Sequence, residues 1–390
     1  MDLFVEVAFD SLNKFQEELC GDMVNVIRLK DCTILVLSDG LGSGVKANIL
    51  STLTSKIAGT MLKEGADIYE TVDTIVNTLP ICKVRNIAYS TFTIIKIYKD
   101  GKTYIAEYDN PPLLIIRNNK FLEIPKKEIK IKDKTVYESN INLQDGDLIT
   151  IVSDGVIHAG LGEILNLGWE WSNVRDYLER RSLQNATAQF ITKDLLEVCF
   201  NLYDGKPGDD TTVVSMKVKS PQYVDLFTGP PKEDCNDKLA ISEFMKGKGK
   251  KVICGGTAAN IAERELNKTL EVNLDFENTD LPPTATMEGI DLITEGVLTL
   301  NKAVELIKNY SNPFYEKNNI PDISGNDAAS KLVKLLIEDC THLNIWAGSA
   351  VNPAHQNPDL PLDLTIKLKL IKQLCDHMKK LGKHVDLYYI

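Results

Sequence analysis

Residues 35–44 read LVLSDGLGSG, an apolar run that ends in Asp39 and continues into a glycine-rich turn. Residues 149–155 repeat this arrangement as ITIVSDG, in which Asp154 follows the apolar run. Short runs of apolar and β-branched residues bounded by glycine are typical of buried strands. Each stretch therefore predicts a buried strand with an aspartate at its carboxyl end.

Three other aspartates adjoin predicted strands. Asp209 and Asp210 directly precede the apolar run 211–218, and Asp22 precedes a further apolar stretch. Taken singly, an aspartate beside a glycine is an ordinary turn. Carboxylates that converge repel one another unless a cation lies between them, and carboxylate oxygen is the ligand type that Mg²⁺ and Mn²⁺ favour. If the fold brings all these aspartates together, they predict a divalent metal site.

The first half of the chain reads as a layered α+β domain. Apolar positions 45, 49, 53, 57 and 61 recur at helical spacing, and the ordinary expectation for such a helix is packing against a core. Further helices are expected at residues 68–79, 171–181 and 186–202, and further strands at 88–98, 103–107, 113–117 and 147–152. Two helix pairs and many strands joined by short turns predict helices that cover an antiparallel double sheet.

Polar residues 221–237, with the turn sequence GPP at 229–231, predict a linker. Residues 1–220 would then form one domain. Strand and helix patterns alternate along residues 238–390, which predicts a smaller α/β domain with a parallel or mixed sheet.

Three loops of this second domain suggest a ligand site. Residues 254–260 (CGGTAAN) follow a predicted strand and open a helix, which leaves backbone N–H groups available to an anion. Residues 294–296 and 352–358 follow other strands, and ligands bind α/β domains at the carboxyl ends of strands. The loops predict a small-molecule or phosphate-bearing ligand that regulates the first domain. A tight turn with Thr257 as helix cap remains the alternative at residues 254–260.

The composition excludes several classes of protein. The net charge is −11, and the basic residues are scattered, which disfavours a nucleic-acid-binding protein. No stretch approaches the roughly 18 uninterrupted apolar residues of a membrane span, and the acidic start MDLFVE differs from a secretory signal. The eight cysteines form no CxxC pair, so zinc and redox motifs of that kind are absent. We expect a cytoplasmic protein.

Five short motifs occur in a fixed order along residues 1–220. They are Gly21-Asp22, the stretch 38–44, Asp109-Asn110-Pro111-Pro112, Ser153-Asp154-Gly155 and Asp209-Asp210-Thr211-Thr212. This order and spacing resemble the metal-dependent serine/threonine protein phosphatases, specifically the bacterial branch typified by stage II sporulation protein E. The resemblance implies an αββα sandwich with a two-metal centre between the sheets.

The resemblance also implies a role for each acidic position. Asp39 matches the carboxylate that bridges both metal ions, and Gly40 matches the residue that contributes its carbonyl oxygen. Asp154 matches a ligand of one ion, and Asp209 matches the aspartate that completes its shell. Asp210 is the second choice for that last role. Asp39, Asp154 and Asp209 are therefore the expected catalytic residues.

The remaining matches carry one departure from the family. Asp22 corresponds to an acidic residue that acts near the other ion, through water. In eukaryotic members a histidine follows the Asp-Gly motif and protonates the leaving group, whereas this chain has Leu41 there. His158, four residues after Asp154, is an alternative proton donor, although a polar loop residue is the favoured interpretation.

The function implied by the resemblance is hydrolysis of phosphoserine or phosphothreonine. Two Mn²⁺ or Mg²⁺ ions would activate a water for in-line attack. The substrate would be a phosphorylated regulatory protein such as an anti-sigma-factor antagonist. Two alternatives stay open: a catalytically degenerate phosphatase fold used as a sensor or scaffold, and an enzyme that acts on a small molecule through its C-terminal domain.

Overall fold

The structure is a computed structural model of the whole chain, and it divides into two compact units at residue 220. Each unit is described by itself. The description covers residues 2–78, 90–132, 134–183, 187–273, 282–312, 325–350 and 366–390.

The first unit contains two antiparallel sheets. The six-stranded sheet has the order β2-β3-β4-β5-β9-β8. Its strands are β2 (Asp22–Arg28), β3 (Cys32–Gly40), β4 (Ser90–Tyr98), β5 (Lys102–Tyr108), β9 (Lys134–Asn142) and β8 (Lys127–Ile131). The five-stranded sheet has the order β1-β11-β10-β6-β7. Its strands are β1 (Phe4–Leu12), β11 (Thr211–Lys219), β10 (Leu148–Val152), β6 (Leu114–Arg117) and β7 (Lys120–Phe121).

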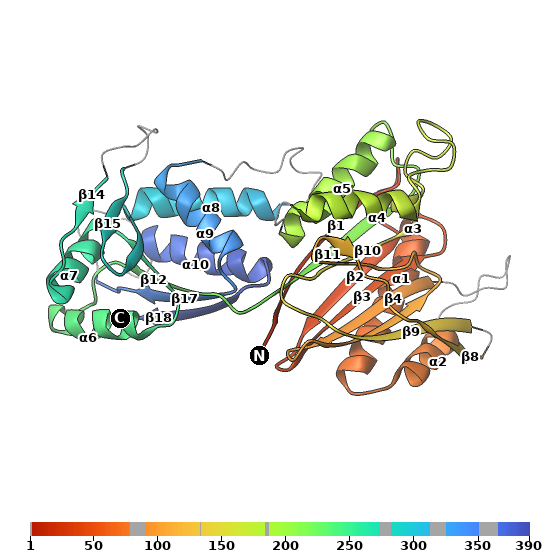
Figure 1. Cartoon of the computed structure of the whole chain (residues 1–390), viewed down its shortest axis with the longest axis horizontal. Helices are drawn as coiled ribbons and strands as arrows, with labels where there is room; N and C mark the ends of the chain where they lie inside the picture. Colours follow the sequence, from red (N-terminus) through yellow and green to blue (C-terminus); the bar gives the residue numbers. More distant parts are fainter. Residues whose placement is uncertain are drawn as a thin grey trace. The chain divides into compact units, whose positions relative to one another are not determined.

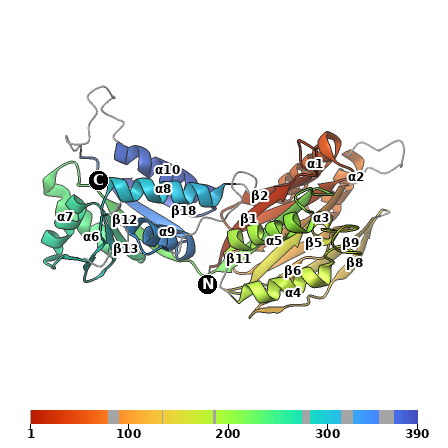
Figure 2. The ribbon, with the colours of Figure 1, turned by 90° about the horizontal axis from the view of Figure 1, so that it is seen from above.

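The two sheets pack face to face, and helices cover both outer faces (Figures 1 and 2). Leu35 and Ile95 from one sheet and Val214 and Met216 from the other share a fully buried core. Helices α1 (Gly44–Lys63) and α2 (Ile68–Thr78) cover the six-stranded sheet. Helices α4 (Trp171–Ser182) and α5 (Ala188–Leu202) cover the five-stranded sheet. The predicted αββα sandwich is confirmed.

Helix α1 packs with a different face from the one that its apolar spacing indicates. Val45, Ile49 and Leu53 are 60%, 50% and 38% exposed. The buried face consists mainly of small residues: Gly44, Ala47, Ser51, Thr54, Ser55, Ala58, Gly59 and Leu62. Small side chains let the helix axis approach the sheet closely, and a Cβ atom added at Gly59 would lie only 2.6 Å from Nδ2 of Asn25 on β2.

The second unit contains a sheet with the order β14-β15-β16-β13-β12-β17-β18. Its strands are β14 (Glu271–Val272), β15 (Ala285–Met287), β16 (Ile290–Thr294), β13 (Lys250–Cys254), β12 (Tyr223–Thr228), β17 (His342–Ala347) and β18 (His384–Tyr389). The five strands from β16 to β18 run parallel, and β14 and β15 pair antiparallel at one edge. The expected α/β architecture of this region is confirmed.

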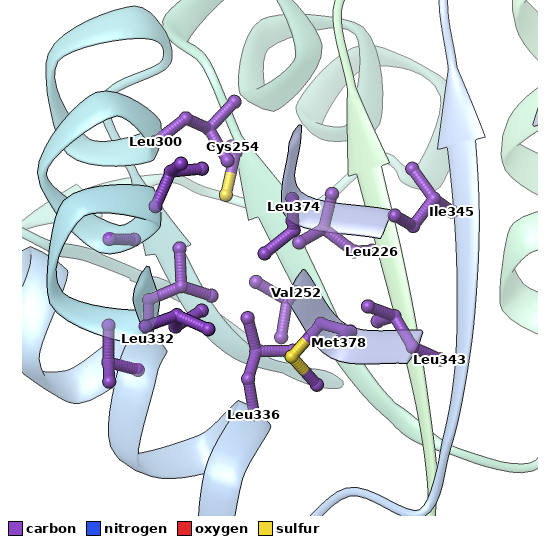
Figure 3. Close-up of a cluster of buried hydrophobic side chains, with 14 of the residues drawn as sticks. Leu226, Val252, Cys254, Leu300, Leu332, Leu336, Leu343, Ile345, Leu374 and Met378 are labelled. Carbon is purple, nitrogen blue, oxygen red and sulfur yellow. The ribbon is translucent and has the colours of Figure 1, made fainter. Parts of the chain in front are cut away.

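Helices cover both faces of this second sheet. Helices α6 (Asp237–Lys246) and α7 (Gly256–Leu266) pack on one face. Helices α8 (Val297–Ser311), α9 (Ala328–Glu338) and α10 (Ile366–Lys380) pack on the other (Figure 1). The core beneath the second group joins Leu226, Val252 and Leu343 of the sheet to Leu332 and Leu374 of the helices (Figure 3). The first parallel strand, β12, lies in the middle, so the chain winds outward in both directions from it.

The segment expected to be a linker, residues 221–237, contains this central strand. Strand β12 pairs with β13 on one side and β17 on the other. Its apolar run is interrupted by Asp225, which hides the strand pattern in the sequence. In the fold Asp225 is fully buried, and its carboxylate contacts the Lys251 ammonium at 2.5 Å. A long-range ion pair therefore makes an acidic residue acceptable inside a parallel sheet.

Other elements also lack a local signal or extend past the described residues. The sequence patterns leave out β1, β8, β9, β15, α6 and α10. The expected positions 79, 88–89 and 186, and the loop 352–358, lie outside the described residues.

Helix α1 has 20 residues, but it carries three lysines, and none of the helices that the structure describes has the length and apolar character of a membrane span.

Candidate functional site

Asp22 and Asp39 face each other across the edge of the six-stranded sheet. They are directly paired in the antiparallel register of β2 and β3. The Gly40 N–H donates to the Gly21 carbonyl over 3.2 Å, which extends the ladder by one bond. Residues paired in this way have neighbouring side chains. The predicted association of these two aspartates is therefore built into the strand pairing.

The other aspartates come from the five-stranded sheet. Asp154 begins the short helix α3 (Asp154–Ile157) directly after β10, and Asp210 immediately precedes β11, the neighbour of β10. A Cβ atom added at Gly155 would lie 2.2 Å from the Asp210 carbonyl oxygen. One added at Gly21 would lie 2.7 Å from Oδ2 of Asp210. The strand ends of both sheets thus meet at one place.

Gly40 lies against the first turn of α1. A Cβ atom there would lie about 2.0 Å from the Ala47 carbonyl oxygen. Since that neighbour is backbone, it has no rotamer by which to move away. Only glycine fits at residue 40 while α1 keeps its position.

The aspartates of the cluster have raised pKa values because they are buried and lie near one another. Burial, together with the charges of Asp210 and Asp154, raises the pKa of Asp22 from 3.8 to about 8, against hydrogen bonds from Thr212 and Ser153 that lower it. Burial likewise raises the pKa of Asp39 to about 9, with further contributions from the charges of Asp22, Asp154, Asp209 and Asp210. Each group is harder to ionise, first because it is buried and then because the others are charged.

Asp154 and Asp210 show the same trend. Burial raises the pKa of Asp154, and the charge of Asp209 adds to this shift. The charge of His158, an exposed residue one turn further along, lowers the pKa of Asp154. Burial also raises the pKa of Asp210, against hydrogen bonds from the backbone of Lys14 and Gly21 that lower it.

Several carboxylate oxygens are buried without a hydrogen-bond partner. They are both Oδ atoms of Asp22 and Oδ2 of Asp210, and both residues are only 4% exposed. The hydroxyls of Ser153 and Thr212 also lie near Asp22 and lower its pKa; the Ser153 oxygen accepts from the Thr212 N–H, and the Thr212 hydroxyl contacts that of Ser11. Unpartnered buried carboxylate oxygens are hard ligands in need of a cation, so the residues fit Mg²⁺ or Mn²⁺.

The side chains do not by themselves enclose an ion. In the part of the chain that the structure describes, no three acidic, histidine or cysteine side chains are arranged to hold a metal ion. The aspartates share a site, and coordination would require their side chains to turn toward one centre. This is the expected relaxed arrangement of acidic groups that repel one another.

Asp209 and Asp210 differ in their surroundings. The Asp209 side chain is 40% exposed, and its Oδ1 lies 3.8 Å from Nζ of Lys14. Oδ1 of Asp210 instead accepts a hydrogen bond of 3.0 Å from the Lys14 backbone N–H. Lys14 therefore contacts both acids across 195 or more positions of sequence. No sequence pattern indicates this residue, because the contact arises only from the packing of the loop before β2.

A cavity of about 670 Å³ opens beside Asp154. The segment Asp109-Asn110-Pro111-Pro112 lines one wall, and Lys126 and Lys134 lie on another. Asn110 is fixed by the Thr91 hydroxyl, which donates to Oδ1 over 2.6 Å, and by its own Nδ2, which donates to Thr93. This motif therefore shapes the approach to the acidic cluster.

In the metal-free protein, the free energy of unfolding of the first unit should fall as the pH rises from about 4 to about 8. The unfolded chain releases the Asp22 proton near the ordinary pKa of 3.8, but the folded chain holds it until about pH 8. In that window the folded state binds more protons, so each such group removes up to ~1.4 kcal/mol per pH unit. Urea unfolding in EDTA at pH 5 to 8 measures the slope. The slope should be shallower in Asp22→Asn, and an unchanged slope there would contradict the assignment.

Comparison with known proteins points to one family for the first unit. Residues 30–219 match the family model described as "Stage II sporulation protein E (SpoIIE)". Stage II sporulation protein E of Bacillus subtilis (strain 168) is 24% identical over 186 residues, which is 47% of this chain and 22% of that protein. This chain thus corresponds to less than a quarter of the length of that curated relative.

Solved structures of the same type are also similar. One is the PP2C phosphatase domain of SpoIIE from Bacillus subtilis, solved with a fragment of its regulatory domain. It is 22% identical, the match covers 56% of this chain and 63% of the solved chain, and the TM-score is 0.47. RsbX in complex with magnesium is 16% identical, the match covers 55% of this chain and 96% of the RsbX chain, and the TM-score is 0.41. Residues 30–219 therefore match the stage II sporulation protein E family, and the C-terminal region is unassigned.

Proposed function

We propose that the chain is a metal-dependent protein serine/threonine phosphatase. The observation that carries this proposal is the buried acidic cluster, in which both carboxylate oxygens of Asp22 and one of Asp210 have no partner. Five acids in one place destabilise the fold unless cations neutralise them. A degenerate fold that binds no metal would gain nothing from retaining them.

The residues proposed to hold two Mn²⁺ or Mg²⁺ ions are Asp22, Asp39, Asp154, Asp209 and Asp210, with the carbonyl oxygen of Gly40. When bound, such ions acidify water and neutralise charge on a transferring phosphoryl group. The chain contributes the fixed strand ends, which keep these oxygens together before the substrate arrives. Ser90 supports them by donating a hydrogen bond of 2.8 Å to the carbonyl of Asp39.

The cavity beside Asp154 is the proposed entrance for the phosphorylated side chain. Lys126 and Lys134 give this entrance positive charge, although Lys126 also pairs with Glu107 at 2.5 Å. Positive groups near the mouth of a site attract a phosphorylated peptide over the distance that salt screening allows. The proposed substrate is a phosphorylated regulatory protein, for example an anti-sigma-factor antagonist.

Removal of metal tests the proposal. Hydrolysis of para-nitrophenyl phosphate by the full chain should rise by about 100-fold or more when Mn²⁺ replaces EDTA, since metal ions supply several kcal/mol of transition-state stabilisation. Mn²⁺ should also raise the melting temperature, because it binds the folded cluster. Turnover that is equal in EDTA would contradict the proposal. Metal binding without turnover of either this probe or a phosphopeptide would favour the sensor alternative.

A further inference from the structure

The second unit contains a cavity of about 130 Å³ at the carboxyl ends of its parallel strands. Its walls come from the ends of β12, β13 and β16 and from the start of α10. This is where the chain turns from one side of the sheet to the other, the usual ligand position in doubly wound folds. A cavity of this volume accommodates a phosphoryl-sized group.

Two helices begin at this cavity. The first helical hydrogen bond of α7 runs from the Ala259 N–H to the Gly255 carbonyl, so the N–H groups of Gly256, Thr257 and Ala258 have no helical acceptor. Helix α8 begins at Val297, beside Gly296. A Cβ atom added at Gly296 would lie 3.3 Å from the Cα atom of Gly255. The positive ends of two helix dipoles therefore converge.

A buried hydroxyl lines the same cavity. Thr228, at the end of β12, is only 1% exposed, and its side chain makes no hydrogen bond with any residue that the structure describes. It is paired in register with Cys254, which Figure 3 shows beside Leu300 of α8. A hydroxyl without a protein partner favours a ligand that bonds to it. A ligand oxygen in the cavity would satisfy it.

The cavity also holds a cation. Lys367 lines it, and among the described residues its ammonium contacts only the Gly348 carbonyl, at 2.6 Å. Gly229 makes room for this side chain, because a Cβ atom there would collide with Nζ. Glu295 brings an acid to the wall, but its Oε2 already accepts a hydrogen bond from the Leu298 N–H. The ammonium is thus free to pair with an anion.

We propose that this cavity binds the phosphoryl group of a small phosphate monoester. The starts of two helices, a hydroxyl and an ammonium line this one cavity. A tetrahedral phosphate has enough oxygens for all of these donors, whereas a carboxylate has two. The organic part would extend outward, where the second oxygen of Glu295 suits a ligand hydroxyl. This inference does not depend on the phosphatase proposal.

The test uses the full chain in EDTA, so that the acidic cluster of the first unit repels phosphate. Calorimetric titration with inorganic phosphate, a sugar phosphate and a nucleoside monophosphate should show saturable binding of at least one probe. Lys367→Gln and Thr228→Val should each weaken it by about tenfold or more, the effect of losing one strong hydrogen bond. Lys372→Gln, on the exposed side of the same helix, should stay within about twofold of the wild type.

A further variant separates binding from folding. No atom lies within 4 Å of a Cβ added at Gly256, so Gly256→Asp is accommodated and places a carboxylate at the start of α7. It should abolish phosphate binding while the melting temperature is maintained or raised.

If inorganic phosphate binds as tightly as the esters, the ligand is phosphate itself. If the esters bind more tightly and Glu295→Gln removes the difference, the ligand is an ester. No binding of any probe up to about 10 mM, or equal binding by all variants, would overturn the proposal.

Discussion

Replacing Asp39 with asparagine is expected to lower metal-dependent phosphatase turnover by about three orders of magnitude. Asp39 lies opposite Asp22 in the β2–β3 register, and its carboxylate interacts with the charges of four other aspartates. Asparagine keeps the size of the side chain but removes its negative charge. The loss would therefore reflect weakened metal binding and not a cavity. Mn²⁺ titration by calorimetry, together with para-nitrophenyl phosphate turnover, measures both effects.

Asp100→Asn is the matched control for this substitution. Asp100 is exposed and lies beyond the far end of β4, the strand whose Ser90 end adjoins Gly40. It should keep wild-type turnover. In EDTA, Asp39→Asn should also be more stable than the wild type above about pH 7, because one repelling carboxylate is gone. Persistent Mn²⁺-dependent turnover in the variant would rule out the assigned site.

Replacing Lys251 with methionine should destabilise the second unit by about 3–5 kcal/mol, the usual result of leaving one partner of a buried ion pair without the other. Asp225 is fully buried in the central strand, and Lys251 is its only charged partner among the described residues. Asn344 and the Gly249 N–H also donate to this carboxylate, but they do not neutralise it. The melting temperature of this unit should fall by roughly 6 °C or more.

The neighbouring lysine supplies the control. Lys250 pairs with Asp339 at 2.8 Å, but both side chains are nearly half exposed, so Lys250→Met should cost less than about 1 kcal/mol. The double variant Asp225→Asn with Lys251→Met should lose less than Lys251→Met alone, since no unpaired charge remains. Urea unfolding followed by Trp346 fluorescence, with Trp169 and Trp171 of the first unit replaced by phenylalanine in every variant, distinguishes these cases. Equal destabilisation by Lys250→Met and Lys251→Met would contradict the argument that the buried ion pair stabilises the second unit.

The sequence predicts the layers of the first unit well because its buried strands carry continuous apolar runs. Strands β3, β4 and β11 are recognisable in this way, and the aspartates beside β3 and β11 lie at strand ends as expected. The strand β12 is missed because Asp225 breaks its run. Its counter-ion is 26 residues away, so no local pattern shows that the charge is neutralised.

The candidate site, too, is predictable only where local motifs mark its residues. The aspartates follow from motif order, since each motif is local. The contact of Lys14 with Asp210 spans 196 positions, and the unpartnered state of the Asp22 oxygens depends on packing between two sheets. Both come from tertiary structure, which local periodicity does not encode.

Helix α1 shows that periodicity predicts a helix without predicting which side is buried. The spacing of Val45, Ile49 and Leu53 is helical, yet these side chains point to solvent while alanine, serine and glycine meet the sheet. The α1 backbone lies against Gly40, and side chains of β2 lie against Gly59, so larger residues are excluded from the inner side of the helix.

This arrangement separates two kinds of evolutionary freedom on a single helix. Substitutions at Val45, Ile49 or Leu53 would change the apolar surface that the domain presents to other molecules without disturbing its interior. A larger side chain at Ala47 would instead press on Gly21, the neighbour of Asp22, because the Ala47 Cβ atom lies against Gly21. The exposed face of this helix can therefore change in evolution without a change at the acidic centre.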